Sequence, residues 1–441
     1  MRSATVQRAR IPEAPRRRSI RTPATAVAAT TAAVLATSVW GRWLQANGHH
    51  LFVNLPPLVG HLDPRFAPVG VAAPLLGLGA VVYGPALAAR LPWRRLLAVT
   101  LLVAAAWATS LALTEGVHGL IRGPSSPQDY LHDAPLIRSP STFLRTYIDD
   151  IDRYSVHVRA HPPGMALIAW SLSRVGGGPG WLAALEILVG ASAVPAVLIA
   201  VRDTSGEDRA RAVAPYLAFA PLAVSIASSG DALFAGVGAW AVTLVVLATG
   251  RRDRRGDLLS LGGGLLLGVT AFLSYGLVLL WIIPLAVAGA RRRARPIVLA
   301  TIGAVPVVLA FSAAGFWWFA GLLATRVEYL EGVARSRPYG YFLVANIAAL
   351  AVIVGPATVA GLASPSRWPR TTWALVGGAL AAAALADLSG MSKAEVERIW
   401  LPFAVWAVVA TGALPGPSRR RWLAANVGVA LLLEVLVSQP W

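Results

Sequence analysis

Acidic side chains gather in one long polar stretch, residues 115–180, and their spacing is suited to proton transfer. Glu115 directly follows an apolar run, and Asp149, Asp150 and Asp152 form a tight cluster. A carboxylate in such a place can act as a general base. Repulsion within the aspartate cluster favours a metal ion, an arginine partner or a raised pKa. The plain alternatives are a helix-end acid for Glu115 and a solvated acidic face for the cluster.

Basic side chains that can bind a phosphate occur in the same stretch and in two later ones. His161 precedes two prolines and a glycine, which fix the backbone and begin a short helix, so the imidazole lies at the positive end of that helix. Arg398 opens a late apolar run, and its guanidinium can hold a phosphate through two hydrogen bonds. A plain loop-to-helix boundary for His161 and an interface anchor for Arg398 remain alternatives. The remaining candidates for binding the substrate or the donor phosphate are Arg159, Arg335, Arg337 and the acid Glu397.

The elements that must position these side chains are membrane helices. Hydrophobic residues make up 56% of the chain and the mean hydropathy is +0.61, well above the range of soluble domains. About thirteen apolar segments approach the length that crosses a bilayer. These segments are 23–43, 67–89, 96–114, 181–201, 210–229, 231–249, 257–275, 276–290, 296–318, 340–363, 371–387, 399–414 and 422–438. We therefore predict an all-α, polytopic transmembrane protein.

The arginines orient this protein in the membrane. Most of the 39 basic residues fall in alternate gaps between the apolar segments. These gaps are 2–21, 90–95, 202–211, 251–255, 291–295, 367–370 and 419–421. Short cytoplasmic loops retain Lys and Arg, so we predict a multi-pass protein of the plasma (inner) membrane with its N-terminus cytoplasmic and its C-terminus extracytoplasmic. The same reading explains the net charge of +18 without a nucleic-acid partner.

One short apolar segment, residues 164–175, decides this orientation. At roughly 1.5 Å per residue it falls well short of the hydrocarbon core, so we predict an interfacial or re-entrant helix on the outer side. The loop 115–180 that contains it is expected to form short amphipathic helices. Phe143, Leu144, Tyr147, Ile148 and Ile151 recur at helical spacing and leave the aspartates on another face.

The chain divides into four parts. Residues 1–22 are predicted to be a disordered basic cytoplasmic tail and 23–95 to form two added helices; the core is 96–414 and the last helix lies in 415–441. The chain has no cysteine, which excludes disulfides and thiolate chemistry. Abundant Ala, Gly and Arg with a single lysine, Lys393, is typical of a GC-rich bacterial genome such as that of an actinobacterium.

Four features together resemble the GT-C superfamily of polytopic membrane glycosyltransferases over residues 96–414. They are Thr114-Glu115 at the outer end of an early helix, a long loop ending in His161-Pro162-Pro163, Asp231-Ala-Leu-Phe at a span start, and the late Glu397-Arg398-Ile-Trp. The chain is most similar to uncharacterised actinobacterial membrane proteins of that superfamily. It is more distantly similar to protein O-mannosyltransferases and aminoarabinose transferases. Unlike the protein mannosyltransferases, it has no Asp-Glu pair after Thr114.

The resemblance implies inverting transfer of a sugar from a polyprenyl-phosphate donor to an extracytoplasmic acceptor, which is a cell-envelope glycan, lipid or protein. It implies a loop carboxylate as base, Arg and His side chains on the donor phosphate, and in some members a divalent cation. Glu115 matches the family's acid, although the cluster 149–152 stays an alternative. We expect the base, His161 and Arg398 to line one outward-opening cavity at headgroup depth.

A membrane transporter or lipid flippase is the alternative function. Transporters place ionisable groups near the middle of the membrane. Here the acids at membrane depth are few: Glu186, Asp231, which can simply cap its helix, and Glu434. This scarcity and the long outer loop favour the enzyme.

Overall fold

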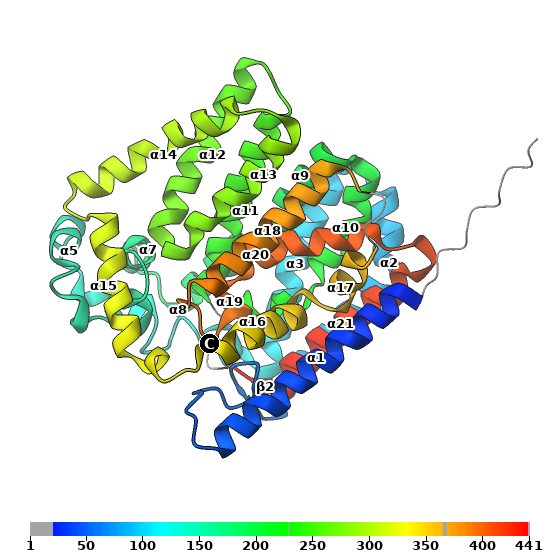
Figure 1. Cartoon of the computed structure of the whole chain (residues 1–441), viewed down its shortest axis with the longest axis horizontal. Coiled ribbons are helices and arrows are strands. Elements are labelled where there is room, and N and C mark those ends of the chain that lie inside the picture. Colours follow the sequence, from blue (N-terminus) through cyan, green and yellow to red (C-terminus); the bar gives the residue numbers. More distant parts are fainter. Residues whose placement is uncertain (1–20, 228, 365–367, 440–441) are drawn as a thin grey trace, which may run out of the picture.

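Helices account for nearly all regular structure in the residues that the structure describes, which are 21–227, 229–364 and 368–439. In this computed structural model the longer helices pack side by side, and short helices and loops cover one end (Figure 1). The two strands found in these ranges, β1 (His61–Leu62) and β2 (Val437–Ser438), form one antiparallel pair. The predicted all-α class is therefore confirmed. The prediction of a disordered tail at 1–22 falls almost wholly outside the described residues.

Eight helical segments in the described ranges are long and apolar enough to cross a membrane, which makes the chain a multi-pass membrane protein. One of them joins two helices, α8 and α9, into a single apolar segment from Pro179 to Ser205. The helices of these segments are α1 (Arg21–Ala46), α2 (Ala72–Arg90), α3 (Trp93–Ala112), α8 (Pro179–Ala191), α9 (Ala193–Ser205), α11 (Gly230–Thr249), α12 (Arg254–Leu273), α14 (Arg295–Ala313) and α18 (Arg370–Leu388).

The count of thirteen spans is not confirmed, because five predicted segments are short, bent or charged. They contain α10 (Glu207–Ala218), η7 (Tyr275–Trp281) with α13 (Ile282–Arg291), α16 (Tyr339–Val354) with α17 (Pro356–Leu362), α20 (Leu401–Ala407) with η10 (Val408–Ala413), and α21 (Arg419–Leu436). A bend of 104° separates α16 from α17, so this pair forms at most one broken span. The helix α10 has 12 residues, and α21 begins with three arginines.

Small residues allow the longest helices to approach closely. The helix α12 packs against α14, and a Cβ added at Gly264 would lie 1.9 Å from the carbonyl oxygen of Ala300. On the facing helix, a Cβ at Gly303 would lie 2.2 Å from the carbonyl oxygen of Leu261. Membrane helices associate through such small residues, because apolar side chains gain little by leaving lipid for protein. The glycines therefore set the spacing of this helix pair.

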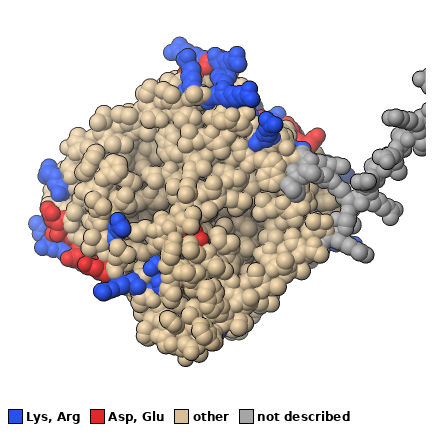
Figure 2. Space-filling view, in the orientation of Figure 1, with Lys and Arg blue, Asp and Glu red and all other residues tan. Residues whose placement is uncertain are grey.

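The two ends of the bundle differ in their charges. Figure 2 shows basic side chains grouped at the top, over the turns that join α11 to α12 and α13 to α14. These turns carry the arginines of 251–255 and 291–295. At the lower left, acidic and basic side chains are mixed over α5 (Pro140–Thr146) and α15 (Trp318–Glu331). The bundle thus has one arginine-rich end and one end of mixed charge.

The loop 115–180 forms short helices at the mixed-charge end, as predicted. They are α4 (Tyr130–Asp133), α5, η5 (Ile151–Arg153), α6 (Val156–Arg159) and α7 (Gly164–Arg174). Phe143, Leu144, Tyr147 and Ile151 are buried, which confirms the predicted apolar face. With 11 residues, α7 is too short to cross a membrane as a straight helix.

The hydroxyl of Tyr147 fastens the end of this loop. It lies 2.5 Å from the carbonyl oxygen of Val158 and 2.6 Å from that of His161. Its ring is fully buried and stacks on Tyr154 at 5.8 Å between centroids. One side chain therefore fixes both α6 and the His-Pro-Pro turn.

Candidate active site

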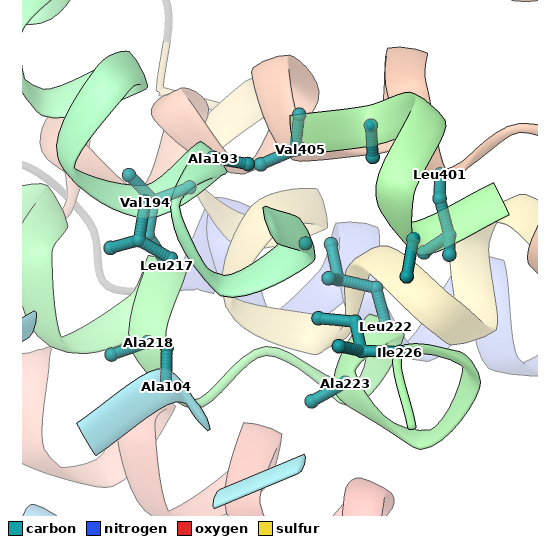
Figure 3. A pocket seen from close by; sticks show the side chains of 13 residues that line it. Ala104, Ala193, Val194, Leu217, Ala218, Leu222, Ala223, Ile226, Leu401 and Val405 are labelled. Carbon is teal, nitrogen blue, oxygen red and sulfur yellow. The ribbon is translucent and has the colours of Figure 1, made fainter. Parts of the chain in front are cut away.

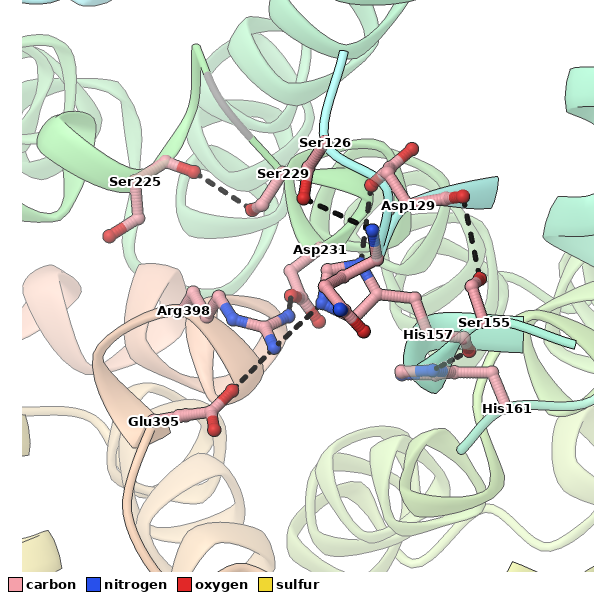
Figure 4. A network of polar contacts seen from close by, with 11 residues as sticks. Ser126, Asp129, Ser155, His157, His161, Ser225, Ser229, Asp231, Glu395 and Arg398 are labelled. Atoms are coloured by element: carbon pink, nitrogen blue, oxygen red, sulfur yellow. Dashed lines mark hydrogen bonds and ion pairs between the residues drawn. The ribbon is translucent and has the colours of Figure 1, made fainter. Parts of the chain in front are cut away.

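Arg398 is the centre of a buried polar cluster between loop 115–180 and the late loop 388–398. Its Nη1 donates to Oδ2 of Asp231 at 2.6 Å, and its Nη2 donates to Oε2 of Glu395 at 2.6 Å. Nη2 also lies 3.4 Å from Nε2 of His157. Figure 4 shows these side chains pointing toward one another from separate segments. We call this group, with Asp129 and His161, the Arg398 cluster.

The backbone just before Arg398 is strained, and a neighbouring helix holds it in place. Arg398 lies on α19 (Val396–Ile399), directly after Ala394 and Glu395, whose φ angles are 73° and 62°. Consecutive non-glycine residues rarely adopt this left-handed conformation unless their surroundings impose it. Asn346 of α16 supplies that constraint, because it accepts from the backbone of Ala394 at 3.2 Å and donates to the carbonyl of Ser392 at 2.6 Å.

Asp231 reaches the cluster from the start of α11. It is the second residue of that helix, so the simple cap considered from the sequence is wrong. Its carboxylate lies in the first turn, where the helix dipole stabilises negative charge. Asp231 is 3% exposed and Arg398 is 5% exposed, so this ion pair is nearly closed off from water. The neighbouring acids raise the pKa of Arg398 despite its burial, and it stays charged.

His157 and Asp129 form a second pair within the cluster. Nδ1 of His157 lies 3.2 Å from Oδ2 of Asp129. A carboxylate only accepts, so this contact places the proton on Nδ1 and leaves the lone pair on Nε2, which faces Arg398. The ring of Tyr130 lies 5.8 Å from that of His157, and the backbone N–H of His157 donates to the carbonyl of Gln128 at 3.1 Å.

His161 is brought to the cluster, but not as a positive charge. Its Nδ1 lies 2.8 Å from the carbonyl oxygen of His157 and therefore donates to it. Burial lowers the pKa of His161 to about 4, against the opposing effect of Asp231. The imidazole is neutral at pH 7. The phosphate-binding role predicted for His161 therefore cannot come from its charge.

Glu186 of α8 adds a fourth acid near Asp129 and Asp231. It is fully buried, and neither carboxyl oxygen has a hydrogen-bond partner among the described residues. It lies close enough to Asp129 and Asp231 to interact with both electrostatically. The described residues contain no group of three or more His, Asp or Glu arranged to hold a metal ion, so nothing in them supports the expected divalent cation.

A small apolar void lies next to the Arg398 cluster, between helices that include α11 and α20. It measures about 20 Å³, and Figure 3 shows the aliphatic side chains around it. Ala232, which follows Asp231, and Leu401, three residues after Arg398, both line it. One water would fill such a space, but polar partners are missing, so it stays dry. The polar cluster therefore ends sharply against an apolar layer.

Glu115, the first candidate base, lies in a different group of charges. Its carboxylate forms an ion pair with Nη2 of Arg65 at 2.5 Å and a second ion pair with Arg122. Two guanidinium groups occupy the oxygens that a base must offer to a proton. Within the described residues no hydrogen bond or ion pair joins Glu115 to Arg398. The predicted meeting of Glu115, His161 and Arg398 is therefore not observed.

The aspartates of 149–152 are also separate from the Arg398 cluster. Asp149 and Asp152 are exposed, and Asp150 pairs with Arg153 at 2.9 Å. They lie on the face opposite the buried Phe143 and Tyr147. Among the described residues none has a hydrogen bond or ion pair with Arg398. The solvated acidic face, which the sequence left as an alternative, is what the structure contains.

The other predicted phosphate ligands serve different contacts. Arg159 pairs with Glu328 of α15 at 3.0 Å, and Arg335 is exposed. Arg337 is buried and donates to three backbone carbonyls, those of Leu51, Phe52 and Lys393. Arg337 therefore joins loop 44–66 to the late loop.

Glu397 makes the same junction from the other side. It is fully buried, and its Oε1 accepts from the backbone N–H of Val59 at 2.6 Å. Burial raises the pKa of Glu397 to about 7, although the Val59 N–H opposes the shift. Its neighbour Arg398 reaches the cluster, whereas Glu397 turns toward loop 44–66.

Sequence reasoning thus found Arg398 and His161 but missed their partners Asp129, His157 and Glu395. One local signal was available. His157 and His161 are four residues apart, and Glu395 and Arg398 are three apart, and both spacings bring side chains to one side of a helical turn. The contact of Arg398 with Asp231 spans 167 residues and has no local signal.

Comparison with known proteins places the chain in no group: no family model, no curated protein and no solved structure matches it.

Proposed function

We propose that this chain is a membrane glycosyltransferase that moves a sugar from a polyprenyl-phosphate donor to an extracytoplasmic acceptor. The observation that carries the proposal is the buried Arg398, held by two carboxylates and touching an imidazole. A guanidinium offers paired N–H donors that match phosphate oxygens as well as they match a carboxylate. A donor phosphate exchanges with Glu395, the more exposed of the two acids, while Asp231 keeps the guanidinium oriented.

The placement of the cluster supports a lipid-linked donor. Asp231 begins one apolar helix and Arg398 immediately precedes another, so the guanidinium lies where the apolar segments end. A polyprenyl phosphate has its charge at this depth and its chain in the hydrocarbon. Phosphate is a good leaving group when a fixed positive charge stabilises it, and here that charge is fixed before the donor arrives.

The orientation follows from the arginine-rich turns. We place them in the cytoplasm, with thirteen crossings of the plasma membrane, and the Arg398 cluster then faces outward. The bent pair α16–α17 and the short apolar segments count as crossings in this arrangement. A C-terminal reporter that is active only in the cytoplasm would contradict it.

Release of the lipid phosphate tests the function without knowledge of the acceptor. The full-length protein in nanodiscs is incubated with undecaprenyl-phosphate mannose, glucose or arabinose and a bacterial envelope extract. We expect free undecaprenyl phosphate to form from one of these donors. Arg398→Ala abolishes the release and weakens undecaprenyl-phosphate binding, whereas the exposed Arg326→Ala preserves both. A wild type that neither binds undecaprenyl phosphate nor releases it overturns the proposal.

A transporter or lipid flippase is the second candidate, and Glu186 is the observation that favours it. A buried carboxyl within an apolar helix and without a hydrogen-bond partner is a common feature of ion and proton pathways. Proteoliposomes distinguish the two functions. A flippase moves the intact lipid-linked sugar to the other leaflet, whereas a transferase breaks its sugar–phosphate bond.

A further inference from the structure

We propose that His157, oriented by Asp129, is the group that takes the proton from the acceptor hydroxyl. This inference rests on the proposed transferase function and assigns the base within the same site. It replaces Glu115 and the aspartates of 149–152 in that role.

The pair has the geometry of an oriented base. Asp129 is 2% exposed, whereas the side chain of His157 is 20% exposed, so the acid lies behind the imidazole and the imidazole meets the solvent. The carboxylate fixes the ring through Nδ1 at 3.2 Å. A buried acid that holds Nδ1–H sets the tautomer and stabilises the imidazolium that forms when Nε2 takes a proton.

The backbone around the pair is held as firmly as the ring. The N–H of His157 donates to the carbonyl of Gln128, the residue before Asp129. The backbone N–H of Ser155 donates to Oδ2 of Asp133 at 2.6 Å, and its hydroxyl lies 3.4 Å from the carbonyl of Asp129. These contacts fasten α6 to α4, so the two members of the pair keep their spacing.

The other acids near Arg398 are less suited to this step. Asp231 and Glu395 are both engaged by the guanidinium. Glu186 is fully buried within an apolar helix, where an acceptor hydroxyl cannot reach it. His161 is 9% exposed and lies behind His157. His157 is therefore the basic group of the cluster that combines partial exposure with an oriented lone pair.

Arg398 links this base to the donor. Nη2 of Arg398 lies 3.4 Å from Nε2 of His157 and occupies the direction from which a proton arrives. A donor phosphate that draws the guanidinium toward itself removes this obstruction. The base thus becomes available when the leaving group is already bound, and water is a poor competitor before that moment.

The transfer step balances with these groups alone. Nε2 of His157 takes the proton of the acceptor hydroxyl, and the oxygen lone pair forms the new bond to the anomeric carbon. The bond from that carbon to the phosphate oxygen breaks, and its electron pair leaves with the polyprenyl phosphate. Arg398 stabilises the added negative charge, and the carboxylate of Asp129 stabilises the imidazolium until its proton passes to water.

A pair of conservative variants tests the assignment in the assay of phosphate release. His157→Gln keeps a polar side chain but removes the basic lone pair, and we expect kcat to fall on the order of 100-fold or more. Binding of undecaprenyl phosphate is expected to stay unchanged, because Arg398 is intact. His132→Gln, in an exposed histidine of the same loop, is the matched control and keeps the wild-type rate. Added imidazole is expected to restore part of the activity of His157→Ala.

The pH profile separates a base from a structural residue. The wild-type rate is expected to fall on the acidic side, because a protonated base cannot accept a proton, and this limb disappears in His157→Gln. The charged and titratable groups that face the imidazole are Asp129 and Tyr130 from α4, His161 from the next turn, and Glu395 and Arg398 from the late loop. Asp129→Asn, which removes a positioning residue, is expected to move this limb and lower kcat without changing donor binding.

Nitrogen-15 NMR of the histidine side chains gives a reading that needs no turnover. With the resonances assigned by His157→Gln, we expect the proton of His157 on Nδ1 at neutral pH, and a loss of this preference in Asp129→Asn. A proton on Nε2 overturns the assignment. If the wild type is active and His157→Gln is fully active as well, His157 is not the base, but the transferase function stands. A wild type that neither binds nor cleaves any donor removes the transferase function and this role with it.

Discussion

Two groups of paired charges lie where apolar helices end, and they differ in the balance between acids and arginines. In the first, which we call the Glu115 cluster, Arg65 and Arg122 both pair with Glu115, Arg65 also pairs with Asp63 at 3.3 Å, and Glu434 lies close enough to interact with both arginines and Glu115. Nη1 of Arg122 also donates to the carbonyl of Gln439 at 3.0 Å, and the backbone N–H of Arg65 donates to that of Val435. In the Arg398 cluster, one guanidinium serves two carboxylates and touches an imidazole.

This difference separates a structural group from a functional one. In the Glu115 cluster two arginines serve three acids and both hold Glu115, and these arginines fasten the C-terminal segment beside β1. In the Arg398 cluster one guanidinium serves four acids, because Asp129 and Glu186 lie nearby and neither pairs with an arginine among the described residues. A guanidinium shared among competing acids can change partners when a phosphate arrives. Glu115 is already held by two arginines, so its cluster gains nothing from a change of partner.

Removal of Arg398 is expected to lower the stability of the protein most. Arg398→Ala leaves the buried Asp231 and the partly exposed Glu395 without their cation, and we expect a loss of about 3–5 kcal/mol of stability. Adding Asp231→Asn removes one of the unpaired charges and should recover part of the loss. Thermal and chemical unfolding of the purified protein in detergent measures both. An unchanged unfolding midpoint in Arg398→Ala would show that the acids of the Arg398 cluster are not shielded from water.

The Glu115 cluster should respond in stability and not in catalysis. Glu115→Gln removes the charge between two guanidinium groups, and we expect a loss of about 1.5–3 kcal/mol, the range for hydrogen bonds to charged groups. Transfer activity of the folded protein is expected to persist. The exposed Glu331→Gln serves as the control with no effect on either. If Glu115→Gln loses phosphate release while its stability is unchanged, Glu115 and not His157 is the base.

Glu397 is expected to make the stability of the protein depend on pH. Its pKa is raised to about 7 by burial, so the neutral carboxyl stabilises the fold. This contribution is fully present below the ordinary pKa of about 4.5 and is lost as the pH rises through about 7. Between pH 6 and pH 8 we expect a loss of about 1.4 kcal/mol. Unfolding midpoints across this range measure it, and Glu397→Gln should remove this part of the pH dependence. A wild type that gains stability over this range would contradict the burial argument.

The exposed aspartates should give the smallest effects. Asp149→Asn and Asp152→Asn change solvated side chains, and we expect stability changes within about 0.5 kcal/mol and unchanged phosphate release. Asp129→Asn, the matched change at a buried aspartate of the same loop, should lower the rate. Equal activity of all three variants would remove the distinction between the exposed and the buried acids.

The fold was predictable from the sequence to the level of its elements. Each of the thirteen apolar segments contains helix in its described residues, and the buried face of 143–151 followed from residue spacing alone. The number of crossings did not follow, because hydropathy cannot show that α16 and α17 meet at 104°. A glycine and a proline at that junction are tolerated in straight membrane helices as well as bent ones.

The site was predictable only in part. Arg398 and His161 were selected from local patterns, and the same patterns selected Glu115 and Asp149, which belong elsewhere. Local sequence shows that an acid ends a helix, but it does not show which arginine that acid will meet. The acids that Arg398 contacts include Asp231, 167 residues earlier in the chain.

The sequence by itself determined the apolar segments, the arginine-rich turns and the short helices of loop 115–180, because each depends on side chains a few residues apart. The tertiary structure alone decided that Asp231 and His157 meet Arg398 and that Arg65 and Arg122 take Glu115. The physical reason is that ion pairs across long separations depend on how helices pack. For α11, which carries Asp231, that packing depends on a small residue, because a Cβ added at Gly236 would lie 1.9 Å from the carbonyl oxygen of Val189 in α8.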